Sequence, residues 1–425
     1  MSKKIIDLMM ILGILIFLIF PANFVLASED NMLSVVIDPG HGGTNHGANY
    51  NGWHEEDITL ITSLAMKERL EDFNNVKVYI TREDDVSLSL EERAAFAHNA
   101  DADILISLHY NASEKHDLYG TEVWVPSSGI NYTLAKGLGE CLIKKYTDKG
   151  YYDRCVKTKI GESEKDYYGI IRNAAEYSIP SIIMEHCFID NSIDENTLDM
   201  EKIKQFGVWD AEAVAEYYDL PPKTTPKHPY KPIPDIITDP SYNNEIIYDD
   251  RTEPTDVKLN IISTDSNGNA EIELSAHDSE SKLIYYSYST NGGIDWTDLK
   301  KWSSGEHCIF TVDLSGCNTL CARAYNCFDL FTECSIPVKS NTEKMYVLSD
   351  FDLSTESSST TFQDDLHSHP EIQIQHDFTS THQYETKTTP KTDYNPRKNH
   401  TLILIGICLI LFFLLSIIII SHDKR

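Results

Sequence analysis

Short apolar runs that end in a histidine or a carboxylate most constrain how this chain folds. One run leads into the glycine-rich turn that holds His41, a second ends at His109 and a third ends at Glu185. These runs indicate buried strands, and the stretches between them have helical spacing. We expect strands at residues 33–37, 76–81, 104–109, 120–125 and 181–186, with helices starting near Ile58, Leu90, Thr133 and Met200. This alternation predicts an α/β domain with helices on both faces of a sheet.

The reactive side chains at these strand ends suit a metal-dependent hydrolase. Two imidazoles, His41 and His109, with the carboxylate of Glu55 form a three-ligand set typical of catalytic zinc. A separate carboxylate, Glu185, is then available as the general base for a water molecule. Each residue also has a simpler interpretation. A lone histidine at a strand end is often structural, and an acidic residue in the first turn, such as Glu55, is favoured by the helix dipole. Glu185 is harder to explain in this way, since a buried charge needs a partner or a metal.

Six segments, in this order, resemble the zinc-dependent N-acetylmuramoyl-L-alanine amidases of the Amidase_3 type. They are VIDPGHGG (36–43), GWHEED (52–57), TREDDVSLSLEER (81–93), ADILISLHYNA (102–112), GTEV (120–123) and PSIIMEHCFIDN (180–191). The resemblance implies a twisted mixed sheet flanked by helices, and it selects Glu55 over Glu56 as the acidic ligand.

The same resemblance implies a mechanism. His41, Glu55 and His109 bind Zn²⁺, and Glu185 is the catalytic base for hydrolysis of the bond between muramic acid and L-alanine in peptidoglycan. Asn111 is a candidate for orienting the substrate.

Other positions in these segments are given structural roles or depart from the family pattern. Arg82 and Arg93 are expected to stabilise the fold through carboxylates such as Asp85 or Glu92. His54 and Glu56 stand where basic residues are common, which changes the local charge beside the metal. His54 is also a competing candidate ligand. Cys155 replaces a common glycine, and both it and Cys187 are interpreted as buried thiols.

Composition divides the rest of the chain. Prolines recur over residues 221–250, which predicts a stiff linker. Residues 251–340 alternate apolar and polar positions, which predicts a small immunoglobulin-like β-sandwich. Residues 341–399 carry few aliphatic side chains and are expected to form a disordered Ser/Thr-rich stalk. Of the five cysteines in the predicted sandwich at least one is left unpaired unless it bonds another chain.

The two ends of the chain predict export and anchoring. Residues 1–27 combine Lys3 and Lys4 with an apolar run and a small-residue cleavage site, as in a signal peptide. The apolar run 401–421 is long enough to form a transmembrane helix, although a faint similarity to a sortase signal precedes it. We therefore expect a single-pass protein of the cell membrane whose catalytic domain is extracellular and faces the cell wall.

The charge balance argues against one class of partner. The formal net charge is −30, and no basic face is evident, so we expect no nucleic-acid partner. The expected partners are peptidoglycan and, through the C-terminal helix, the membrane. A non-catalytic peptidoglycan-binding surface protein and an adhesion protein led by the sandwich remain alternatives.

Overall fold

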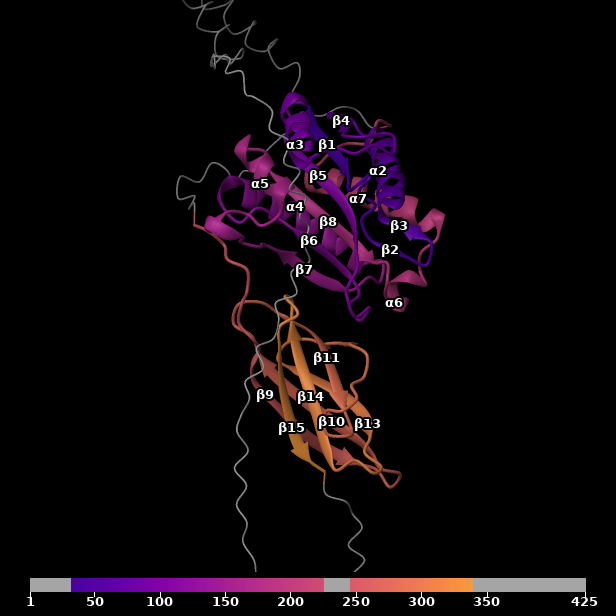
Figure 1. Cartoon of the computed structure of the whole chain (residues 1–425), viewed down its shortest axis with the longest axis vertical. Helices are drawn as coiled ribbons and strands as arrows, with labels where there is room; N and C mark the ends of the chain where they lie inside the picture. Colours follow the sequence, from indigo (N-terminus) through magenta and orange to yellow (C-terminus); the bar gives the residue numbers. More distant parts are fainter. Residues whose placement is uncertain (1–31, 225–244, 339–425) are drawn as a thin grey trace, which may run out of the picture. The chain divides into compact units, whose positions relative to one another are not determined.

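Six strands form the central sheet of the first domain, in the order β4-β1-β5-β8-β6-β7. The computed structural model (Figure 1) describes residues 32–224 and 245–338. The strands are β1 (Leu33–Pro39), β4 (Val76–Ile80), β5 (Ile104–Asn111), β6 (Thr121–Trp124), β7 (Asp153–Lys157) and β8 (Ser181–Phe188). Strands β4, β1, β5 and β8 are parallel, whereas β6 pairs antiparallel with β8 and parallel with β7. The prediction of a mixed sheet is confirmed.

Helices cover both faces of this sheet, as the apolar runs predicted. One core cluster packs Val35 and Ile106 against α2 (Glu55–Leu70), α4 (Gly129–Thr147) and α7 (Met200–Tyr217). A second cluster packs Val36 and Leu105 against α3 (Leu90–Asn99) and α5 (Gly169–Glu176). Alternate residues of β1 and β5 therefore face opposite layers, which explains why both strands are continuously apolar.

The expected boundaries were close for the long elements and incomplete for the short ones. Strands β1, β5 and β8 each extend two residues beyond the predicted end. The sequence patterns did not indicate β7, α5, the short helix α6 (Ser192–Glu195), the 3-10 turn η1 (Glu162–Glu164) or the hairpin strands β2 (Asn49–Tyr50) and β3 (Trp53–His54).

Residues 251–338 form two antiparallel sheets that share one apolar core, which confirms a β-sandwich. The first sheet contains β9 (Thr255–Thr264), β10 (Asn269–His277) and β13 (His307–Asp313). The second contains β11 (Leu283–Ser289), β12 (Lys300–Lys301), β14 (Thr319–Asn326) and β15 (Phe331–Pro337). Ile272 and Phe310 of one sheet join Tyr286 and Leu320 of the other in this core. The immunoglobulin-like assignment stays a prediction.

A disulfide joins the two domains. Cys155 in β7 is bonded to Cys327, which follows β14 and lies 172 residues further along the chain. The expectation of a free buried thiol at Cys155 is therefore wrong, because its partner lies in a domain that local sequence does not connect with it. Cys187 is a buried free thiol, as expected. All described residues belong to one compact unit of the chain.

Several predicted segments lie outside the described residues. These are the signal peptide, most of the proline-rich linker, the stalk and the C-terminal apolar run. Within residues 32–224 and 245–338, no helix has the length and apolar character that a membrane span requires.

The disulfide gives a first prediction. Replacing both Cys155 and Cys327 with serine should lower the free energy of unfolding by about 2–4 kcal/mol, because the unfolded chain regains the freedom of a long closed loop. Denaturant titration of the purified protein measures this change. Reductant should lower the stability of the unmodified protein similarly and leave the double variant unaffected; an equal loss in both would contradict the assignment.

Candidate metal centre

The topology brings the predicted reactive residues to one edge of the sheet. Strands β1, β5 and β8 are parallel neighbours, so their carboxyl ends lie side by side. His41 follows β1, His109 lies near the end of β5, and Glu185 lies opposite His109 in β8. In open α/β sheets, ligands bind at this carboxyl edge.

Glu55 joins the two imidazoles in a tight cluster. Its Oε2 atom lies 3.0 Å from His41 Nε2, and its Oε1 atom lies 3.0 Å from His109 Nδ1. One possible ligand atom from each of the three residues lies within 4.8 Å of the others. Two imidazoles and one carboxylate around a common point are the donor set of catalytic zinc sites, and they leave a position open for water.

Glycines provide the space that this cluster needs. A β-carbon at Gly40 would lie 2.4 Å from the His109 ring, and one at Gly47 would lie 2.4 Å from Glu55 Oε2. His41 itself has a φ of 60°, a left-handed conformation that is costly for a non-glycine residue. In the loop between β1 and α2, glycines therefore leave room for the three side chains to meet, and His41 adopts a strained backbone conformation there.

Hydrogen bonds fix the orientation of two candidate ligands, His41 and Glu55. His41 Nδ1 lies 3.0 Å from Asn45 Oδ1, which leaves Nε2 directed at the cluster. The Glu55 carboxylate also accepts hydrogen bonds from the backbone N–H groups of Ala48 and Tyr110. Since Glu55 begins α2, the positive end of that helix also favours its charge.

Two buried arginines hold the backbone of the His41 loop. Arg82 donates to the carbonyls of Pro39 and Gly40, and Arg93 donates to that of His41. Arg93 also pairs with Asp38 at 2.7 Å. The expected structural role is confirmed, but the expected partners Asp85 and Glu92 are not the ones used.

Charge favours an ionised carboxylate between two imidazoles. Burial opposes ionisation of Glu55, but the nearby imidazoles of His41 and His109 outweigh burial and lower its pKa. Burial lowers the pKa of His109, which keeps its imidazole neutral as a metal ligand requires. At His41, burial also lowers the pKa, but attraction to Glu55 outweighs burial. The pKa of His41 is therefore raised.

Glu185 has the features expected of a general base beside this cluster. Its Oε2 atom is buried and has no hydrogen-bond partner among the described residues. Burial raises the pKa of Glu185, and the neighbouring charges of Glu55 and Glu122 raise it further. A buried carboxylate oxygen without a partner fits a site that receives a water or a substrate group.

Other candidates lie outside the cluster. Glu56 pairs with His46 at 2.6 Å, which agrees with the choice of Glu55 as the acidic ligand. His54 is exposed and contacts Asn49, so it is not part of the cluster. Asn111 donates to Glu122 Oε1 and accepts from the backbone N–H of Ala112, and its substrate role stays a prediction.

Sequence reasoning missed the residues that surround Glu122. This carboxylate lies beside Glu185 in the ladder between β6 and β8, and it binds Arg154 and Lys157. The segment GTEV marked Glu122 only as part of a resemblance. Its charged neighbours in β7 gave no apolar pattern, so no local signal could have identified them.

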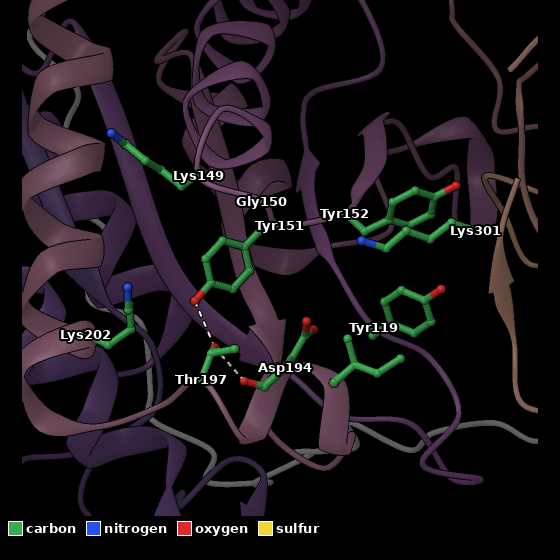
Figure 2. A pocket seen from close by; sticks show the side chains of 10 residues that line it. Tyr119, Lys149, Gly150, Tyr151, Tyr152, Asp194, Thr197, Lys202 and Lys301 are labelled. Atoms are coloured by element: carbon green, nitrogen blue, oxygen red, sulfur yellow. Dashed lines mark hydrogen bonds between the residues drawn. The ribbon is translucent and has the colours of Figure 1, made fainter. Parts of the chain in front are cut away.

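A separate pocket of about 150 Å³ contains none of the clustered residues. Its walls carry the side chains of tyrosines and lysines, and Figure 2 shows Tyr151 hydrogen-bonded to Thr197 there. The lining residues are Tyr119, Lys149, Gly150, Tyr151, Tyr152, Ile193, Asp194, Thr197, Lys202 and Lys301. The clustered residues therefore lie at the sheet edge and do not line this pocket.

The fold and the cluster define an α/β domain with a candidate metal centre at its carboxyl edge. A family model described as N-acetylmuramoyl-L-alanine amidase matches residues 35–215. The N-acetylmuramoyl-L-alanine amidase CwlM of Bacillus licheniformis is 33% identical over 175 residues, which cover 41% of this chain and 61% of that protein.

In two further relatives the similarity covers a larger share of the relative's own length. An endolysin of Bacillus phage SPP1 is 32% identical over 200 residues, covering 46% of this chain and 70% of the endolysin. The uncharacterized protein YqiI of Bacillus subtilis is 34% identical over 191 residues, covering 44% of this chain and 85% of YqiI. The chain belongs to the N-acetylmuramoyl-L-alanine amidase family.

The glycine contacts give a second prediction. Gly47→Ala should weaken metal binding about tenfold or more, because the new methyl group displaces Glu55. Gly52→Ala is the matched control, since Gly52 also has a positive φ but nothing lies within 4 Å of its added β-carbon. Metal content and affinity of the two purified variants measure the difference. Equal metal binding by both variants would show that this close approach is not needed.

Proposed function

We propose that this chain is a zinc-dependent N-acetylmuramoyl-L-alanine amidase that hydrolyses the amide bond between muramic acid and L-alanine in peptidoglycan. The observation that carries the proposal is the cluster of His41, Glu55 and His109 beside the partnerless Glu185 oxygen. Membership of the amidase family supports the choice of substrate. The type of ligand supports zinc, because imidazole and carboxylate together suit this ion.

The chain's own residues would divide the chemistry between them. His41, Glu55 and His109 hold the ion, which when bound polarises the scissile carbonyl and makes a nearby water more acidic. Glu185 takes a proton from the attacking water and returns it to the leaving amine of L-alanine. Burial of Glu185 suits this role, since a carboxylate with a raised pKa is a stronger base.

We also infer a place of action outside the cell, at the membrane. The apolar segments at 1–27 and 401–421 support export and a single anchor. The disulfide between Cys155 and Cys327 supports an oxidising compartment, because such bonds are rare in a reducing cytosol. Peptidoglycan, the proposed substrate, lies in the same compartment.

Substitution of Glu185 tests the proposed chemistry. Glu185→Gln should reduce the release of stem peptides from purified wall by about 10²-fold or more, because the amide cannot accept the proton from water. The variant should keep its zinc, since Glu185 is not in the ligand set. Peptide release and metal content are measured on the same preparation, and full activity of the variant would refute the mechanism.

Two glutamine variants of adjacent residues test the ligand set. Glu55→Gln should lose both zinc and activity, because a neutral amide binds the ion weakly. Glu56→Gln should keep both, since Glu56 contacts His46 instead. Metal analysis and wall hydrolysis distinguish the pair; loss of zinc in Glu56→Gln with retention in Glu55→Gln would reverse the assignment.

A further inference from the structure

A row of three polar side chains crosses the sheet at the catalytic edge. His109 in β5 lies opposite Glu185 in β8, and Glu185 lies opposite Glu122 in β6. Residues directly opposite each other in a ladder share a face, so the three side chains are neighbours. Thr121 adds a contact to the same place, since its hydroxyl donates to the Glu185 carbonyl. The position of Glu122 therefore shapes the surroundings of the proposed base.

Both oxygens of Glu122 are fully used. Oε2 accepts from Arg154 Nε at 2.9 Å and from Lys157 Nζ at 2.7 Å. Oε1 accepts from Asn111 Nδ2 at 2.9 Å and from Trp124 Nε1 at 3.2 Å. Lys157 and Arg154 outweigh the effect of burial and lower the pKa of Glu122 to about 2. Glu122 is thus an ionised, rigidly held group that also orients Asn111.

Two buried cations of the amidase domain share one ion-pair partner at this point. Arg154 is 1% exposed and Lys157 is 3% exposed, yet Glu122 is the carboxylate with which both form ion pairs there. A buried cation without a counter-charge is costly. A second counter-charge for Arg154 comes from the sandwich, where Asp329 accepts from Arg154 Nη2 with both oxygens, at 3.1 and 2.8 Å.

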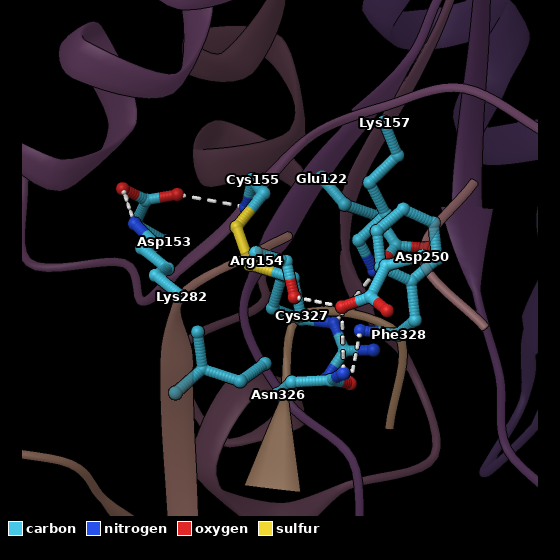
Figure 3. Close-up of a disulfide and its surroundings, with 12 residues drawn as sticks. Glu122, Asp153, Arg154, Cys155, Lys157, Asp250, Lys282, Asn326, Cys327 and Phe328 are labelled. Atoms are coloured by element: carbon cyan, nitrogen blue, oxygen red, sulfur yellow. Dashed lines mark hydrogen bonds and ion pairs between the residues drawn. A yellow bond between two sulfur atoms is a disulfide. The ribbon is translucent and has the colours of Figure 1, made fainter. Parts of the chain in front are cut away.

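Several contacts hold Asp329 against Arg154. Cys155, the residue after Arg154, is disulfide-bonded to Cys327, two residues before Asp329 (Figure 3). The side-chain oxygen of Asn326 accepts from the backbone N–H groups of Phe328 and Leu330, which fixes the turn between β14 and β15.

A tyrosine of the sandwich, Tyr285, forms a further contact between Arg154 and the two domains. Arg154 Nη1 donates to the Tyr285 hydroxyl at 3.2 Å, and that hydroxyl donates to the carbonyl of Tyr119 in the amidase domain. The guanidinium is therefore bonded at every nitrogen, to two domains at once.

The backbone at Cys155 indicates that this arrangement is specific. Cys155 has a φ of 80°, a conformation that L-residues rarely adopt and that glycine adopts readily. A strained residue persists where the surrounding structure over-determines it. Here a cysteine occupies a glycine conformation, and its side chain bonds the segment that carries Asp329.

We propose that Asp329 of the sandwich is a positioning residue for hydrolysis, acting through Arg154 and Glu122 on the site beside Glu185. The sandwich then contributes a residue that positions the catalytic groups of the amidase domain. This inference rests on the proposed function. Asp329 touches neither the metal ligands nor Glu185, so its loss should change turnover while leaving the metal bound.

The test compares two charge-removing variants of the full chain at the same interface. Asp329→Asn keeps the size of the side chain and removes the negative charge that pairs with Arg154. Lys282→Met is the matched control, because Lys282 pairs with Asp153 across the same interface and has no contact with Glu122. Steady-state hydrolysis of a soluble muropeptide gives kcat and KM, and metal content and thermal unfolding are measured in parallel.

We expect Asp329→Asn to lower kcat about ten- to hundredfold with KM and zinc content within twofold, since a small misplacement of catalytic groups has effects of this size. Asp329→Glu, which restores the charge, should recover part of the loss. Lys282→Met should keep kcat within twofold. An unchanged kcat in Asp329→Asn, or an equal fall in Lys282→Met, would overturn the proposal.

Two further measurements separate the possible failures. If Asp329→Asn does not fold, Tyr285→Phe removes one acceptor from Arg154 without changing charge, and it should lower kcat about threefold or more; no change would overturn the proposal. If the unmodified protein releases no stem peptide with zinc bound, the proposed function fails first. In that case the Asp329 variants and the unmodified protein do not differ in kcat, because none of them hydrolyses the substrate.

Discussion

The carboxylate of Glu55, held between two imidazoles, is the interaction on which the candidate centre depends. Glu55 is 4% exposed, and burying a charge is costly unless partners compensate. His41, His109 and two backbone N–H groups supply that compensation. They come from the loop after β1 and from β5, whereas Glu55 itself begins α2. One side chain therefore fixes three segments relative to each other, and the absence of β-carbons at Gly40 and Gly47 makes the approach possible.

Much of the fold follows from local patterns because the sheet is covered on both faces. Continuous apolar runs identify β1, β5 and β8, and parallel pairing then places His41, His109 and Glu185 at one edge. The choice between Glu55 and Glu56 did not follow from spacing. Adjacent residues at a helix start point in different directions, and only the resemblance, and later the geometry, separated them.

Sequence reasoning missed strand β7 and the disulfide of Cys155, because both depend on residues far away in the chain. Strand β7 reads Asp-Arg-Cys-Val-Lys, which resembles an exposed segment, yet Arg154 and Lys157 are buried. Their burial depends on Glu122 and Asp329, which lie 32 and 175 residues from Arg154 in the chain. The partner of Cys155 was hidden for the same reason, since pairing of cysteines cannot be deduced from sequence alone.

Ion pairs from both domains meet at Arg154. Arg154 and Lys157 share Glu122 as their ion-pair partner in the amidase domain, and Asp329 of the sandwich is a second partner for Arg154. Without the sandwich, Arg154 would lose the carboxylate that binds its Nη2 atom. Bringing the two domains together gives the buried Arg154 a second counter-charge, and the Cys155–Cys327 bond holds Asp329 close enough for the ion pair to form. An exported enzyme under the proposed function gains from this arrangement, because the groups beside Glu185 then stay fixed without depending on the proline-rich linker.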